Sequence, residues 1–475
     1  MTDTLLWHDY ETFGIDPARD RPVQFAAIRT DEDLNEIGDP IELFCKPPND
    51  YLPQPDACLI TGITPQRALE RGLPETEFIA KVNAEMAVPH TCSVGYNNLR
   101  FDDEVTRNAL YRNFLDPYAR EWQGGNSRWD IIDLLRAARA LRPEGIEWPV
   151  NADGTPSLRL EHLTVANGIG HEAAHDAVSD VRATIAVARL VRKAQPRLYD
   201  YLFKLRRKQA VTELLDVAHR TPVVHVSGMY PSEYLACSVV MPLVWHPSNN
   251  NGVLVYDLRH DPEPFLGLDV EALRERLFTP REVLGEDKLR LPVKTIHVNK
   301  CPVVAPLKTL DDAARLRTGL DMDAVMRHRE RLLRVPEFDL RVREVFDGDR
   351  FEKPSDPDLM IYSGGFFSDN DKRQMTRVRG LGPSELAGAS FNFEDRRLPE
   401  MLFRYRARNW PDSLSDEEQA VWQEHREYRL MEAGPGVSQT IDDYFERIES
   451  LRAEHPDRSD LLAALEDYGH MLAAL

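Results

Sequence analysis

The residues in this sequence that are best able to do chemistry are acidic side chains near its beginning, first among them Asp9 and Glu11. Residues two apart in a β-strand point to the same side, so a strand through this segment places both carboxylates together. Two adjacent carboxylates repel each other unless a cation lies between them, and oxygen ligands suit a hard divalent ion. An acidic pair at an exposed strand end gives the same pattern without a metal.

A second acidic position follows a predicted short strand that ends at Tyr96. Asp102 and Asp103 fall where a helix is expected to begin, and an acidic residue in a first helical turn satisfies free backbone donors without a further role. The junction of a strand and a helix is also a place where a ligand can bind at a sheet edge. Both interpretations, helix cap and metal ligand, stay open.

The third group is His175 and Asp180, five residues apart at the start of a predicted helix. Such a pair occurs by chance about once in a chain of this composition, and a lone His175 is more often a surface or capping residue. The three groups together carry more information than any one of them. They combine an Asp-x-Glu strand, an Asp after a middle strand and a His-x₄-Asp helix, all within the first 180 residues.

This order and spacing resembles the DEDD exonuclease superfamily, in the subclass that contains a histidine. The other subclass has a Tyr four residues before the last Asp, and here Asp176 occupies that position. The resemblance implies that Asp9, Glu11, Asp102 and Asp180 hold two Mg²⁺ ions, with Mn²⁺ as a possible substitute. Two cations can stabilise the attacking and leaving oxygens of phosphodiester hydrolysis together. His175 is implied as the base, since histidine exchanges a proton near neutral pH.

An α/β domain is needed to position these residues. Alternating apolar runs predict strands at 4–10, 23–29, 40–46 and 92–96. Helical spacing predicts helices at 101–114, 130–141, 158–166 and 176–194. Strands first, then strands alternating with helices, indicate a mixed sheet.

The remainder of the chain differs from the first part in composition and periodicity. Short β-rich runs between 222 and 305 predict a small barrel or sandwich, and 311–345 is helical and highly charged. The composition of 351–358 is that of a linker, and amphipathic helices follow from about 380. We expect domains at 1–195, 196–350 and 351–475.

Composition sets further limits. No apolar stretch approaches the roughly 20 residues of a membrane span. The five cysteines have no metal-ligand spacing and are expected to be reduced, buried thiols of a cytoplasmic protein. The net charge of −20 does not exclude a local basic groove for a nucleic acid. Basic clusters lie at 182–208, 372–379 and 404–408, although each could be a solvated helix face.

The resemblance extends further, to the bacterial exonuclease I family. It covers residues 5 to at least 410 and is carried by these segments: His8-Asp-Tyr-Glu-Thr-Phe-Gly14, Arg21-Pro-Val-Gln-Phe-Ala-Ala-Ile-Arg29, Leu59-Ile-Thr-Gly-Ile-Thr64, Gly95-Tyr-Asn-Asn-Leu-Arg-Phe-Asp-Asp-Glu104, His225-Val-Ser-Gly-Met229, Asn299-Lys-Cys-Pro302 and Phe403-Arg-Tyr-Arg-Ala-Arg-Asn409. The family implies a ribonuclease H-like nuclease domain, an SH3-like domain and a helical C-terminal domain. It also implies processive 3′→5′ degradation of single-stranded DNA to 5′-mononucleotides, in DNA repair and recombination.

The same resemblance assigns binding residues. Glu11 and Arg159 match substrate contacts near the 3′ end, and Arg107, Tyr118, Trp122 and Arg136 match positions along the DNA path. Stacking aromatics with phosphate-neutralising arginines suit sequence-independent binding, although Tyr118 and Trp122 could equally be core residues. Arg142 and Tyr201 match a pocket for the acidic tail of the single-stranded DNA-binding protein. We expect a monomer.

Two other functions remain as hypotheses. A DEDD core could act on RNA ends or proofread beside a polymerase, but such relatives are generally short chains without the middle and C-terminal domains. A catalytically silent DNA-binding scaffold is the second hypothesis. All five catalytic positions are filled, which counts against it.

Overall fold

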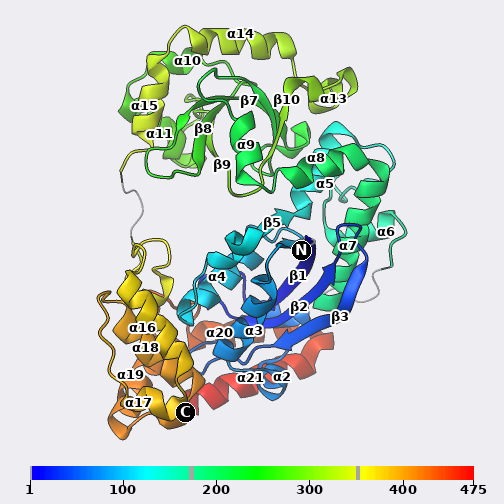
Figure 1. Ribbon diagram of the computed structural model, residues 1–475. Coiled ribbons are helices and arrows are strands. Elements are labelled where there is room, and N and C mark those ends of the chain that lie inside the picture. The colour runs from blue at the N-terminus through cyan, green and yellow to red at the C-terminus, as the bar shows by residue number, and fades with distance from the viewer. Residues whose placement is uncertain (1–2, 171–175, 349–352, 475) are drawn as a thin grey trace. The chain divides into compact units, whose positions relative to one another are not determined.

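The computed structural model describes residues 3–170, 176–348 and 353–474. These residues form two compact units, shown with the rest of the chain in Figure 1. The first unit comprises 1–127, 172–182 and 351–475, and the second comprises 128–171 and 183–350. Each unit is described by itself.

A five-stranded mixed sheet, in the order β3-β2-β1-β4-β5, forms the centre of the first unit. β1 pairs antiparallel with β2 and parallel with β4, which confirms the predicted mixed sheet. The strands are β1 (Thr4–Thr12), β2 (Pro22–Thr30), β3 (Glu36–Phe44), β4 (Thr91–Gly95) and β5 (Ser127–Asp130), where the chain passes into the second unit. In the β1–β2 register, Asp9 lies opposite Ala26 and Glu11 opposite Gln24.

Burial explains which strands are central. β2 is buried along almost its whole length, whereas β3 is exposed and carries Glu36, Asp39, Pro40 and Glu42. Charged residues and proline are typical of an edge strand, because they prevent pairing with another chain. β3 begins four residues earlier than predicted, since the turn after β2 is shorter than the polar run suggested.

Helices of the exonuclease region cover the sheet. They are α1 (Pro55–Thr61), α2 (Pro65–Arg71), α3 (Glu75–Met86), α4 (Asp102–Arg112) and the beginning of α7 (Ala177–Ala194). Leu6, Tyr10 and Phe25 of the sheet pack against apolar residues of α3 and α4. α1 to α3 were not predicted. The two shortest are seven residues each, so they show little periodicity, and both begin with a proline.

The C-terminal segment belongs to the same unit. Its helices are α16 (Asp369–Gly380), α17 (Pro383–Gly388), α18 (Leu398–Asn409), α19 (Asp416–Met431), α20 (Ile441–Glu454) and α21 (Ser459–Ala474). Phe13, Val23 and Phe44 of the sheet region share one apolar core with Tyr444, Leu465 and other residues of these last helices. The helical C-terminal region is therefore part of the first unit's core.

An antiparallel sheet in the order β10-β6-β7-β8-β9 forms the second unit, as the β-rich pattern predicted. Its strands are β6 (Val223–Val226), β7 (Cys237–Trp245), β8 (Gly252–Asp257), β9 (Val293–His297) and β10 (Val303–Pro306). Its helices are α5 (Ile131–Leu141), α6 (Leu160–Ala166), the later part of α7, α8 (Pro196–Lys204), α9 (Lys208–Leu214), α10 (Glu263–Leu266), α11 (Val270–Phe278), α12 (Arg281–Leu284), α13 (Asp312–Thr318), α14 (Met322–Leu333) and α15 (Glu337–Val345).

Short 3₁₀ helices connect these elements: η1 (Ala119–Glu121), η2 (Gln123–Gly125), η3 (Ser232–Tyr234), η4 (Leu307–Thr309), η5 (Pro357–Leu359), η6 (Pro411–Ser413) and η7 (Pro456–Arg458). All five cysteines are buried and none forms a disulfide, as the sequence predicted.

Candidate metal centre and nucleic-acid interface

The acidic residues singled out in the sequence come together in the first unit. Asp9, Glu11 and Asp180 each offer a carboxylate oxygen, and these oxygens lie within 4.8 Å of one another. β1 places Asp9 and Glu11 on one side because they are two residues apart, and the first turn of α7 supplies Asp180. Three oxygen ligands at this spacing suit a hard divalent cation, whose remaining positions water or phosphate oxygens can fill.

The electrostatics of the cluster fit a cation. Burial, together with the negative charges of Asp102, Glu11 and Asp180, raises the pKa of Asp9 well above its ordinary range. Burial, followed by the charges of Asp180, Asp102 and Asp176, raises the pKa of Glu11 to about 8. These carboxylates disfavour one another's ionised forms, and a bound divalent ion reverses that cost by supplying the opposite charge.

Asp102 lies beside the trio, at the first position of α4. Its Oδ1 accepts a hydrogen bond of 3.1 Å from the backbone N–H of Tyr10, which stands between Asp9 and Glu11 on β1. The Thr106 hydroxyl lies 2.8 Å from the Asp102 carbonyl and 3.1 Å from the Tyr10 hydroxyl, tying the helix start to the strand. Asp102 is thus held next to the trio, although it is not one of the three residues whose oxygens lie within 4.8 Å.

The fifth predicted residue, His175, lies outside the described residues. The description resumes at Asp176, whose carboxylate accepts a 3.1 Å hydrogen bond from the Ser179 N–H at the start of α7. Asp176 also contributes to the raised pKa of Glu11.

Arg107, predicted to contact DNA, is buried and fully paired. Its guanidinium forms a bidentate interaction with Glu121 at 2.7 and 2.9 Å, and its Nη1 lies 2.7 Å from Glu104. The Tyr362 hydroxyl bonds to both Arg107 and Glu104. Two carboxylates therefore already neutralise the positive charge of Arg107.

Tyr118 and Trp122 lie in the same region of the first unit. Arg107 lies over the Tyr118 ring, at 5.5 Å from its centroid. The Tyr118 ring meets Phe366 edge-on at 6.4 Å, and Phe366 is 89% exposed. Trp122 is 65% exposed and is not a core residue. The sequence did not identify Tyr362 and Phe366 as neighbours of Arg107 and Tyr118. The one local signal was the pair of glycines at 364–365, which precedes two phenylalanines.

In the second unit, Arg136 of α5 donates to Asp133 at 2.6 Å and packs on Gly228. A Cβ atom at Gly228 would lie 2.9 Å from the guanidinium carbon of Arg136, so a larger residue there would displace the end of the Arg136 side chain. Arg159 precedes α6, and its side chain is 71% exposed, with Glu161 only at 3.9 Å. Arg159 therefore presents an available positive charge, unlike Arg107.

Arg142 and Tyr201 both contact the segment that contains β10 and η4. The Tyr201 hydroxyl donates to the Val304 carbonyl at 2.8 Å, and Arg142 donates to the Thr309 carbonyl at 3.0 Å. Arg142 also pairs with Asp311 at 3.2 Å. Arg317, which was not predicted, donates to the Ala140 carbonyl at 3.3 Å next to Arg142.

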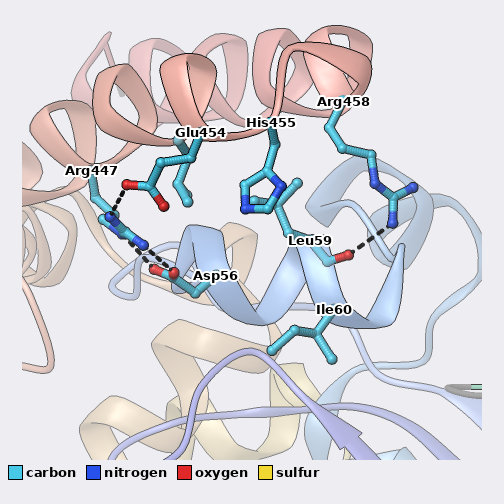
Figure 2. A pocket seen from close by; sticks show the side chains of 8 residues that line it. Asp56, Leu59, Ile60, Arg447, Glu454, His455 and Arg458 are labelled. Carbon is cyan, nitrogen blue, oxygen red and sulfur yellow. Dashed lines mark hydrogen bonds and ion pairs between the residues drawn. The ribbon is translucent and has the colours of Figure 1, made fainter. Parts of the chain in front are cut away.

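One further pocket, of about 360 Å³, lies between α1 and the end of α20 in the first unit (Figure 2). Three of its charged side chains, Asp56, Arg447 and Glu454, are paired with one another. Arg447 bonds to Asp56 at 2.6 Å and to Glu454 at 3.1 Å, while Arg458 donates to the Leu59 carbonyl at 3.2 Å. These contacts join the C-terminal helices to α1.

A mixed sheet covered by helices, with carboxylates of its first strand and of α7 spaced so that they could hold a metal ion, is the arrangement of a divalent-metal-dependent exonuclease with a ribonuclease H-like fold. The family model described as Exonuclease matches residues 6–188. Those described as Exonuclease I SH3-like domain and Exonuclease I C-terminal domain match 206–348 and 355–472. The chain belongs to the bacterial exonuclease I family.

Known relatives agree with this assignment along the whole chain. Exodeoxyribonuclease I of Escherichia coli K12 is 49% identical over 468 residues, which are 98% of this chain and 97% of that protein. The solved structure of exonuclease I from Methylocaldum szegediense is 54% identical, with a TM-score of 0.95 and 99% of each chain covered. That of E. coli exonuclease I in complex with a dA16 oligonucleotide is 47% identical, with a TM-score of 0.94, covering 99% of this chain and 100% of that one.

Other solved structures show what these relatives bind. One is a zinc-bound form of an E. coli exonuclease I complex with single-stranded DNA, and another contains SSB and exonuclease I with an inhibitor. Each is 46% identical to this chain. The zinc-bound complex has a TM-score of 0.93 and covers 100% of both chains. The structure with SSB has a TM-score of 0.90 and covers 99% of this chain and 100% of that one. Among the described residues, no helix is long and apolar enough to cross a membrane.

Proposed function

We propose that this chain degrades single-stranded DNA processively from its 3′ end and releases 5′-mononucleotides, in DNA repair and recombination in the cytoplasm. The observation that carries the proposal is the cluster of Asp9, Glu11 and Asp180, whose mutual repulsion calls for a cation. Membership in the exonuclease I family supports the polarity and the substrate.

In this proposal Asp9, Glu11, Asp102 and Asp180 hold two Mg²⁺ ions, for which Mn²⁺ can substitute. Four carboxylates balance the charge of two divalent ions, and all the ligand atoms are oxygens, as Mg²⁺ prefers. Bound ions of this kind stabilise the charge that develops on the attacking and leaving oxygens. His175 takes the proton of the attacking water, and Glu11 and Arg159 contact the 3′-terminal nucleotide.

In this proposal the aromatic residues Tyr118 and Trp122 stack bases of the strand, and Arg107 and Arg136 act along its path. The exposure of Trp122 supports this role, because an apolar ring left in water is available to a base. The exposed ring of Phe366, in contact with Tyr118, extends the same surface. Arg107 acts here by holding the Tyr118 ring, because two glutamates already neutralise its charge.

A labelled oligonucleotide tests the activity. A single strand with a 5′ label is incubated with the protein and either Mg²⁺ or a chelator. Progressive shortening from the 3′ end only with Mg²⁺ is expected. Immediate release of the label as a mononucleotide would establish the opposite polarity, and equal degradation of an RNA oligonucleotide would favour a role on RNA ends.

We also propose that Arg142 and Tyr201 bind the acidic C-terminal tail of the single-stranded DNA-binding protein. Arg317 adds a second positive charge next to Arg142. Asp311 pairs with Arg142, whereas Arg317 donates to the Ala140 carbonyl. Arg317→Ala is expected to weaken binding of a peptide from that tail, measured by fluorescence anisotropy, while cleavage of free DNA continues. An unchanged peptide affinity would remove Arg317 from the pocket. The protein is proposed to act as a monomer with domains at 1–195, 196–350 and 351–475.

A further inference from the structure

A buried ion pair lies behind the first turn of α4. The Arg120 Nη2 atom lies 2.7 Å from Oδ1 of Asp103, and both side chains are completely buried. A charge without water is retained in a protein core only when it is paired, and Asp103 is the nearer of two carboxylates around Arg120, since Glu121 lies 3.8 Å away. Neither residue belongs to the metal cluster.

The arginine side of this pair is firmly anchored. Arg120 lies in η1, and its carbonyl accepts a 3.2 Å hydrogen bond from the Asn126 side chain. The same amide accepts a 3.0 Å hydrogen bond from the Thr91 N–H, at the start of β4. The position of Arg120 is therefore fixed relative to the strand next to β1.

The pair lies directly against the residues of the metal site. Asp103 follows Asp102, whose carboxylate accepts the Tyr10 N–H between the two ligands of β1. His8, which precedes Asp9, is buried close enough to Asp103 and Arg120 for their charges to act on it. His8 and Asp103 are thus the chain neighbours of Asp9 and Asp102, and Arg120 is paired with Asp103.

We propose that Arg120 and Asp103 are positioning residues for the metal site. By binding the second of two consecutive carboxylates, Arg120 fixes the first turn of α4 so that Asp102 stays at the backbone of Tyr10. It also cancels a charge that would otherwise add to four clustered carboxylates. The inference rests on the proposed role of Asp102 as a metal ligand.

Arg120→Met tests the proposal through metal binding. Affinity for Mn²⁺, measured by titration calorimetry without DNA, is expected to fall about 10–100-fold, the usual loss when a residue supporting metal ligands is removed. The Mg²⁺ concentration for half-maximal cleavage should rise by a similar factor. The affinity for a single strand in chelator should stay within about twofold of the wild type. Arg120→Lys keeps the charge and should recover most of the metal affinity.

Arg112→Met is the matched control. Arg112 forms an equally short and nearly buried pair with Glu75, 2.7 Å apart, at the other end of α4. Its loss should lower the melting temperature without changing Mn²⁺ affinity. If both variants weaken the metal equally, the Asp103–Arg120 pair only stabilises the helix and the proposal is wrong.

A second variant distinguishes a failure to fold from a loss of metal binding. If Arg120→Met does not fold, Asp103→Leu combined with Arg120→Met removes both charges and leaves none unpaired in the core. This double variant should fold and still bind Mn²⁺ weakly. Wild-type Mn²⁺ affinity in a folded Arg120→Met or double variant overturns the proposal. Wild-type affinity in Asp102→Ala would instead overturn the ligand assignment beneath it.

Discussion

Arg107 and Arg159 show how differently two arginines that look alike in the sequence can be placed. Arg107 is buried between Glu104 and Glu121, whereas Arg159 is largely exposed. Phosphate recognition needs a positive charge that is not already neutralised. Residue type alone predicts a DNA contact for both, but only the fold distinguishes a structural arginine from an available one.

This contrast predicts different binding behaviour. Arg159→Ala should weaken binding of a single strand and reduce the slope of log affinity against log salt by about 1, because one phosphate contact is lost. Arg107→Ala should leave that slope unchanged but lower the melting temperature, because Glu121 loses its partner. Anisotropy titrations at several salt concentrations measure both slopes. Equal slopes for the two variants would contradict the distinction.

The carboxylate of Asp102 gives a second prediction at this scale. Asp102→Ala should abolish cleavage and leave binding of the single strand in chelator intact, because the contacts to DNA lie on other side chains. Asp103→Asn serves as comparison: it keeps a polar group on Arg120 and should retain a measurable rate. Wild-type cleavage by Asp102→Ala would remove Asp102 from the metal site.

At the scale of elements, the three arginines of α18 show how a basic cluster in the sequence can form buried ion pairs. Arg404, Arg406 and Arg408 suggest a cationic surface, but Arg404 and Arg406 are buried and the Arg408 side chain is only 7% exposed. Arg408 pairs with Asp50 at 2.7 Å and with Asp358 at 2.8 Å. Burial alone would raise the pKa of Asp50, but Arg408, His425 and Arg429 outweigh it and hold that pKa well below its ordinary value. Arg408 thus joins the C-terminal helices to the nuclease region, whereas Arg404 and Arg406 pair with acidic residues of the C-terminal segment itself.

Breaking this network should be costly. Arg408→Met leaves Asp50 and Asp358 buried without their main partner, which is expected to lower the free energy of unfolding by about 3–5 kcal/mol. Arg377→Met removes an exposed arginine from α16 and is the control, with little expected change. Urea unfolding of both variants measures the difference. A loss for Arg408→Met no larger than for Arg377→Met would show that the network contributes nothing.

A buried histidine makes the second unit sensitive to acid. Burial, with a contribution from the charge of Lys294, lowers the pKa of His225 on β6 to about 3. Between this value and its ordinary 6.5 the unfolded chain binds a proton that the folded unit does not. Stability is therefore lost as the pH falls through this window, by about 1.4 kcal/mol for each pH unit.

The test compares two histidine variants. His225→Asn can still donate to the Val303 carbonyl, which the His225 ring contacts at 2.8 Å, but it does not titrate. Urea unfolding between pH 4 and pH 7 should show a flatter pH dependence in His225→Asn than in the wild type. The exposed His260→Asn should match the wild type. A slope in His225→Asn as steep as in wild type would rule out His225 as the cause.

Elements with a long or regular apolar pattern could be predicted from the sequence. β2, α5 and the strands β6 to β9 of the second unit follow the expected positions, because burial on one or both faces gives them continuous or regular apolar runs. β5 and β10 were missed: both have four residues, β5 contains Ser, Arg and Asp, and β10 ends in a proline. The sequence does contain a signal for α3, because Phe78, Val82 and Met86 have helical spacing.

The candidate site was predictable only in part. Asp9 and Glu11 follow from strand geometry, but the sequence could not decide between Asp102 and Asp103, which share one helical turn. What distinguishes the two aspartates is Arg120, which pairs with Asp103. Arg120 is close to both in sequence but belongs to a separate element, η1. Partners of this kind depend on tertiary structure and leave no local pattern.

At the scale of the whole molecule, charge poses a problem for binding DNA. The chain carries a net charge of −20, and its substrate is a polyanion. Binding must therefore rely on local arginines and on stacking, and the released counterions make it salt-dependent. The affinity for a single strand in chelator is expected to fall steadily as salt rises. Affinity that does not change with salt, measured by anisotropy, would contradict phosphate contacts.

The shared core of the first unit has a consequence for how the protein is made. Phe13, Val23 and Phe44 pack with Leu465, Tyr468 and Leu472, which are synthesised long after them. At typical rates of synthesis, roughly 20–90 s separate the two halves of this core. The core beside the nuclease sheet therefore cannot be complete until these helices have left the ribosome, and the exposed apolar side chains must stay soluble during that time.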